Sequence, residues 1–77
     1  MITTAEVEAM VLKALPGSRV EAVDMTGSSD HFEVTVVSAA CAGKSMVDQH
    51  RMVFAALEKE MDYRIHAVKL KTRASEL

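Results

Sequence analysis

The chain has 77 residues, 49% of them hydrophobic, with one proline, three glycines and one cysteine. This length and composition predict one compact domain over residues 1–77, and they exclude a disordered chain and an intrachain disulfide. Nine basic and eleven acidic residues leave a net charge of −2, which excludes a general electrostatic attraction to nucleic acids, so any such binding needs a local basic patch.

The first predicted element is a helix that begins at Thr3 and ends at Pro16–Gly17. Thr3 can accept a hydrogen bond from an early backbone N–H, and Glu6 lies three positions later, which is the spacing of a capping box. Proline followed by glycine cannot continue the helix. A less regular strand is predicted over residues 19–25, and the turn-forming residues 26–30 predict a loop after it.

The second predicted strand, residues 31–38, has the clearest alternation in the chain. Phe32, Val34 and Val36 point to one side and are expected to face the helices, whereas the intervening residues are mostly polar. Small residues then form a connection that contains Cys41. We interpret Cys41 as a small buried hydrophobe, although the helix start that follows could lower the pKa of its thiol.

A long amphipathic helix is predicted from its N-cap, Ser45, to Met61, and its apolar stripe should lie on a sheet. The stripe consists of Met46, Val53, Phe54, Leu57 and Met61. His50 falls within this stripe, which predicts a core histidine that is hydrogen-bonded to a carbonyl. A final strand is predicted over residues 65–70, with His66 at its start.

The order of these elements predicts an α+β fold of the type α-β-β-α-β. A hairpin followed by a right-handed crossover places the third strand parallel to the second. The prediction is therefore a three-stranded mixed sheet with two helices on one face.

Several classes of protein are excluded by what the sequence lacks. No apolar run reaches the about 20 residues of a membrane span, and the N-terminus does not have the form of a secretory signal, so we expect a cytoplasmic protein without membrane association. The sequence also lacks a Ser-His-Asp arrangement, a Gly-rich phosphate loop and a closely spaced pair of metal ligands. We therefore expect that the chain is not an enzyme.

Two histidines and a group of basic residues are the candidate functional residues. A lone histidine among apolar residues, such as His66, is more often a half-buried structural residue than a ligand, and a histidine at a strand start, such as His31, is more often simply solvated. The basic candidates are Arg51, Arg64, Lys69 and Lys71. The last three form a locally basic edge close to His66, which could help to orient an acidic partner.

Two segments, QHRMVFAALEKEM at 49–61 and IHAVKLKT at 65–72, closely resemble the BolA family, and the resemblance extends from about Val20 to Thr72. It implies a type II KH-like (BolA-like) fold. It also implies that His66, in the Ile-His-Ala step, binds a [2Fe–2S] cluster carried by a monothiol glutaredoxin, with glutathione supplied by that partner. Alone, the chain would hold no cofactor and would be a monomer or a weak homodimer.

The second ligand in this family comes from the loop between the first two strands, as a cysteine or a histidine. Here that loop has no cysteine, so the resemblance points to His31, while Cys41, or no second ligand at all, remain open. The resemblance also offers an alternative function, a DNA-binding transcriptional regulator of stress response and cell morphology. Arg51, Arg64, Lys69 and Lys71 would then contact a partner protein or DNA.

Overall fold

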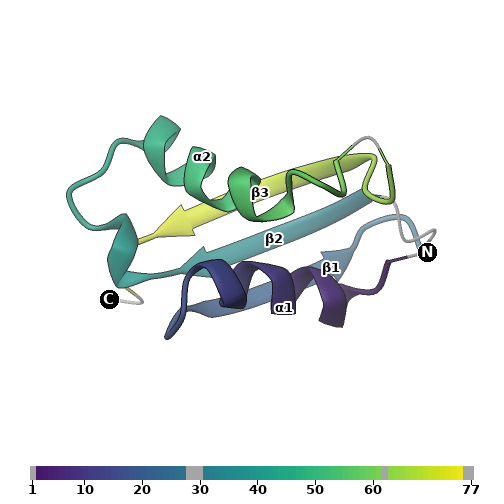
Figure 1. Ribbon diagram of the computed structural model, residues 1–77, viewed down its shortest axis with the longest axis horizontal. Coiled ribbons are helices and arrows are strands. Elements are labelled where there is room, and N and C mark those ends of the chain that lie inside the picture. The colour runs from purple at the N-terminus through teal and green to yellow at the C-terminus, as the bar shows by residue number, and fades with distance from the viewer. Residues whose placement is uncertain (1, 28–30, 62, 76–77) are drawn as a thin grey trace.

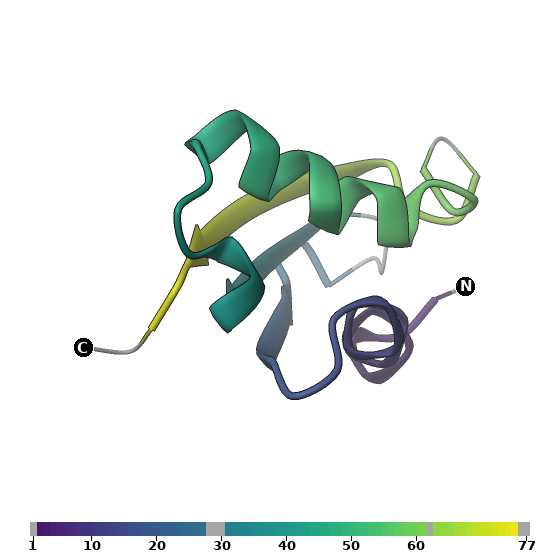
Figure 2. The same ribbon diagram turned by 60° about the vertical axis from the view of Figure 1, so that its left-hand side comes forward.

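The computed structural model describes residues 2–27, 31–61 and 63–75. The elements are α1 (Thr4–Ala14), β1 (Arg19–Asp24), β2 (His31–Val37), a short 3-10 helix η1 (Ala39–Cys41), α2 (Met46–Leu57) and β3 (Ala67–Arg73). Strand β2 is central, antiparallel to β1 and parallel to β3. Both helices lie on the same side of the sheet (Figures 1 and 2). The predicted α+β order and mixed sheet are therefore confirmed.

The two helices begin where their capping residues predict. The hydroxyl of Thr3 accepts a hydrogen bond from the Glu6 N–H at 3.1 Å, and the Glu6 carboxylate accepts one from the Thr3 N–H at 3.2 Å. This is a complete capping box, which satisfies two backbone donors that the helix itself cannot. At the start of α2, the Ser45 hydroxyl accepts from the Asp48 N–H at 3.2 Å.

The core lies between the sheet and the two helices. Phe32, Val34 and Val36 are each fully buried on the inner side of β2, as their alternation predicts. The other members of the core are Ile2, Val7, Val11, Ala22, Val53, Leu57 and Ile65. All of these side chains are apolar, so the interior holds the fold together by packing and leaves the chemistry to the surface.

The second helix begins at its predicted N-cap, but its predicted end and the burial of the first residue of its apolar stripe are wrong. Met46 is 56% exposed, because α2 is buried only along its second half, at Val53 and Leu57. The helix also ends at Leu57, before Met61. The Met46 sulfur lies 3.4 Å from the Thr72 hydroxyl of β3, yet most of the side chain stays in solvent. A helical wheel gives the direction of a side chain but not the fraction of it that its neighbours cover.

The last strand begins two residues later than predicted, at Ala67, and continues to Arg73. Ile65 is instead fully buried in the turn that precedes it. Its N–H donates to the Glu60 carbonyl at 2.8 Å, and it forms an isolated bridge with Met61. Ile65 therefore anchors the turn in the core, and His66 lies between this anchor and the strand.

Cys41 is buried, with 1% of its surface exposed, in η1. Burial raises the pKa of its thiol, and the charge of Lys44 only partly opposes this effect. The interpretation as a small buried hydrophobe is confirmed, and the suggestion that the helix start lowers the pKa is wrong. Among the residues that the structure describes, no helix has the length and apolar character needed to cross a bilayer.

We predict that Leu57→Ala lowers the free energy of unfolding by about 2–5 kcal/mol, because it leaves a cavity under α2 that neighbouring side chains fill only partly. Urea denaturation followed by circular dichroism measures this change. Leu12, which is 39% exposed on α1, offers the matched control, and Leu12→Ala should cost less than about 1 kcal/mol. Equal losses for the two variants would contradict the packing described above.

We predict that Cys41 reacts with iodoacetamide at pH 8 much more slowly in the folded chain than in 8 M urea. The reacting species is the thiolate, and burial both reduces its fraction and blocks access to the sulfur. The reaction can be followed by mass spectrometry, with N-acetylcysteine as a control for the effect of urea on the reagent. A folded-state rate equal to that of N-acetylcysteine would show that the thiol is exposed.

Candidate functional site

The face of the sheet opposite the helices carries His31, Lys69 and Lys71 among the candidate residues, and we call it the open sheet face. Its residues alternate with the buried positions of each strand. They are Arg19, Glu21 and Val23 on β1, His31, Glu33, Thr35 and Val37 on β2, and Ala67, Lys69, Lys71 and Arg73 on β3. An ion pair of 3.3 Å between Lys71 Nζ and Glu33 Oε1 lies across two of these strands.

His31 and His66 meet at one end of this face. His31 is the first residue of β2, and the parallel register pairs it with Ala67, the residue after His66. The two ring centroids are 5.1 Å apart, with the ring planes at 89°. His66 is exposed, whereas His31 is half-buried and its Nδ1 is inaccessible to solvent. The structure thus brings together the two histidines that the sequence identifies as candidates.

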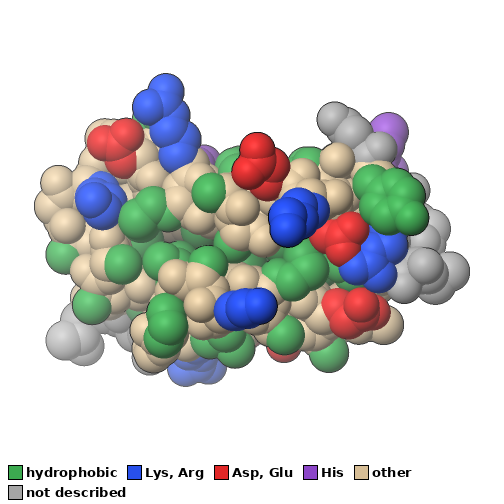
Figure 3. Space-filling view, in the orientation of Figure 1, with side chains coloured by type: hydrophobic (Ala, Val, Ile, Leu, Met, Phe, Trp, Pro, Cys, Tyr) green, Lys and Arg blue, Asp and Glu red, His purple; other side chains and the backbone are tan. Residues whose placement is uncertain are grey.

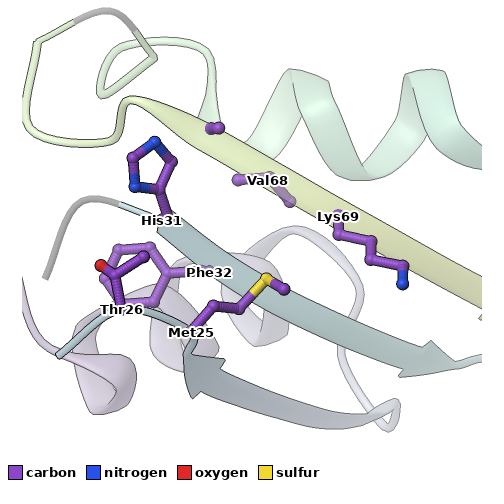
Figure 4. A pocket seen from close by; sticks show the side chains of 7 residues that line it. Met25, Thr26, His31, Phe32, Val68 and Lys69 are labelled. Carbon is purple, nitrogen blue, oxygen red and sulfur yellow. The ribbon is translucent and has the colours of Figure 1, made fainter.

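A shallow hollow of about 390 Å³ opens beside His31 (Figure 4). Its walls are mostly apolar and come from β2, β3 and the two residues that follow β1, with Lys69 as the charged side chain among them. The residues that line it are Met25, Thr26, His31, Phe32, Ala67, Val68 and Lys69. Sequence reasoning missed Met25, although the alternation Arg19, Glu21, Val23 places the next residue of that series on the same face.

The four basic candidates do not form one surface. Lys69 and Lys71 lie on the open sheet face. Arg64 instead forms an ion pair and hydrogen bonds with Glu60, and its Nη1 lies 3.4 Å from Glu6 Oε2. The hydrogen bond to Glu60 is the main reason that the pKa of Arg64 is raised further above its usual value. Arg64 therefore ties the turn before β3 to the start of α1.

Arg51 lies on α2, where its Nη1 is 3.9 Å from Asp48 Oδ1 and its side chain is 78% exposed. This residue belongs to the helical side of the molecule, where basic and acidic side chains are interspersed (Figure 3). The structure therefore separates Arg51 from the lysines beside the histidine pair.

The remaining candidates lie elsewhere. Cys41 follows the far end of β2, so the length of that strand separates it from His31 by roughly 20 Å. His50 lies on α2 and is half-buried. Its Nε2 is buried with no hydrogen-bond partner among the described residues, so this nitrogen does not form the hydrogen bond to a carbonyl that the sequence predicts for His50. Within the described part of the chain, no group of three or more His, Cys, Asp or Glu side chains is placed to hold a metal ion. Of these four residue types, the site therefore offers two imidazoles.

Comparison with known proteins gives a consistent result. The family model described as BolA-like protein matches residues 4–76. Protein BOLA2 of Arabidopsis thaliana is 43% identical over 72 residues, which are 92% of this chain and 76% of that protein. The DNA-binding transcriptional regulator BolA of Escherichia coli is 37% identical over 46 residues, 60% of this chain and 44% of the regulator.

Among solved structures, a BolA protein homologue from Coxiella burnetii superimposes with a TM-score of 0.82 at 33% identity, over 96% of this chain and 92% of that one. The match therefore extends over nearly the whole chain. The sequence and the structure agree that this chain belongs to the BolA family.

Proposed function

We propose that the chain binds a monothiol glutaredoxin and completes a [2Fe–2S] cluster shared by the two proteins, with His66 and His31 as its own ligands. The observation that carries this proposal is the pair of imidazoles, 5.1 Å apart, at the open end of the sheet. The resemblance to the BolA family supports His66 as one ligand. The contact between the rings supports His31 as the other.

The two side chains suit such a cluster chemically. Imidazole is a borderline ligand, and two histidines can replace two cysteines on one iron of a [2Fe–2S] centre. Two imidazoles bound to one tetrahedral metal ion at about 2.1 Å hold their ring centroids about 5 Å apart, close to the observed separation. Because Nδ1 of His31 is buried, Nε2 is the nitrogen that this residue would use.

The chain's residues would have three tasks in the complex. His66, exposed before β3, presents its ring to the partner, and the largely apolar hollow beside His31 limits the access of water. Lys69 and Lys71 lie on the same face, where their charge would steer an acidic partner surface and increase the association rate more than the affinity. The cluster would supply the redox-active iron, and the partner's cysteine and glutathione would supply the remaining ligands.

This arrangement fits a role in iron–sulfur cluster trafficking or in iron and redox regulation. A protein that supplies only two ligands cannot retain a cluster by itself, since the other iron would be left without protein ligands. In this proposal the chain is cytoplasmic and has no cofactor until it meets the glutaredoxin.

We predict that His66→Ala removes the visible circular dichroism bands that wild-type protein induces when it is mixed anaerobically with a cluster-loaded monothiol glutaredoxin. His31→Ala should alter the same bands, because the second imidazole is lost from the same iron. His50→Gln is the matched control, since His50 lies on α2 away from the pair. The far-ultraviolet spectrum of each variant shows whether it is folded.

A His66→Ala spectrum identical to that of wild type would show that His66 is not a ligand. If only His31→Ala gave the wild-type spectrum, the second ligand would have to be sought elsewhere.

A second candidate function is DNA binding in transcriptional regulation. Two observations favour it: a relative in Escherichia coli is described as a DNA-binding transcriptional regulator, and Lys69, Lys71 and Arg73 lie in a row along β3. Such a row could contact successive phosphates, whereas the net charge of −2 would oppose binding elsewhere on the molecule.

If this row binds DNA, the logarithm of the association constant should fall with the logarithm of salt concentration with a slope of about −3, close to one per phosphate contact. Fluorescence anisotropy on a short duplex measures it. The double variant Lys69→Gln, Arg73→Gln should reduce the slope by about two, whereas Lys13→Gln on α1 should leave it unchanged. A flat salt response in the wild type would contradict DNA binding through phosphates.

A further inference from the structure

We propose that Met25, His31 and His66 together form a binding site for Cu(I). The site uses the two imidazoles described above and adds a thioether from the neighbouring strand. It does not depend on the glutaredoxin or on the cluster, because all three donors belong to this chain.

The backbone places Met25 directly opposite His31. The β1–β2 register ends with Asp24 opposite Phe32, and the Met25 N–H donates to the His31 carbonyl at 2.9 Å, which extends the ladder by one residue. Side chains at opposite positions of an antiparallel pair point to the same face, with Cβ atoms about 5 Å apart. The thioether of Met25 therefore starts within reach of the His31 ring.

The side chain of Met25 is free to complete this approach. The residue is 53% exposed and lines the same hollow as His31. In Figure 4 its sulfur lies on the Lys69 side of that hollow. Methionine has an unbranched side chain with three rotatable bonds, so rotation can bring the sulfur toward the imidazoles without any movement of the backbone.

The donor set and the local charge select the metal. A thioether is a soft ligand that favours Cu(I), and neutral imidazole also binds copper. None of the seven residues that line the hollow carries a carboxylate, and Lys69 contributes a positive charge to it. A positive neighbour repels a divalent ion more strongly than a monovalent one. The site should therefore prefer Cu(I) to Zn²⁺ or Mg²⁺.

The test is a competition titration of the full chain with Cu(I) under anaerobic conditions, with ascorbate as reductant and bicinchoninate as the chromophoric competitor. Wild type should take up one equivalent. Met25→Leu should weaken binding by at least about tenfold, since even the loss of an outer-shell contact commonly has this effect, and His66→Ala should weaken it too. Met46→Leu is the matched control, because Met46 is similarly exposed, at 56%, but lies on α2.

The Cε methyl resonance of Met25 in a ¹³C-methyl methionine-labelled sample gives a second readout, which should shift on addition of Cu(I) while that of Met46 stays in place. Equal Cu(I) affinity of wild type and Met25→Leu, or equal losses for Met25→Leu and Met46→Leu, would overturn the proposal. The copper titration contains no glutaredoxin and the cluster spectrum is recorded without copper, so failure of the copper site and failure of the proposed function are separate results.

Discussion

The parallel pairing of β2 with β3 is the constraint on which the rest of the molecule depends. Its register places His31 opposite Ala67, and this register is fixed because Phe32, Val34 and Val36 must all face the core. A shift of one residue would turn every side chain of the strand to the other face of the sheet. The same burial that stabilises the fold therefore also brings His31 next to His66.

Ile65 fixes the backbone next to the second histidine, His66. It is fully buried, its N–H is bonded to the Glu60 carbonyl, and it immediately precedes His66. Burial of a side chain of this size stabilises the fold by about 1.5–3 kcal/mol, whereas the partly exposed ion pairs of Arg64 next to it contribute little. The position of His66 therefore depends on packing: a buried neighbour holds the backbone while the imidazole itself remains in solvent.

The fold could be predicted from local sequence signals because those signals agree with one another. The capping box at Thr3, the break at Pro16 and the alternation around Val34 each mark an element that the structure contains. The C-terminal end of α2 could not be predicted, because periodicity does not reveal that the helix stops at Leu57 or that Ile65 packs into the turn that follows.

For the candidate site, the sequence predicts which residues take part but not how they are arranged. The sequence and the family resemblance identify His66 and His31 one by one, but no sequence pattern shows that their rings touch, since that contact is created by pairing between strands distant in the chain. Met25 could have been placed on the open face by alternation alone. Its relation to His31 follows only from the hydrogen bond that extends the β1–β2 ladder.

In both proposals the histidine pair would supply two donors to a metal ion, and the source of the other donors would decide how the site is used. The backbone beneath both rings is held by the fold, so little backbone conformational entropy remains to be lost when a ligand binds. Whatever supplies the missing donors then determines the outcome: the sulfides of a cluster held by a partner's thiolates would complete an iron site, whereas the Met25 thioether would complete a copper site. Because both uses require the same two imidazoles, Cu(I) and a shared cluster cannot be bound at the same time, and an excess of soft metal ions would compete directly with the glutaredoxin.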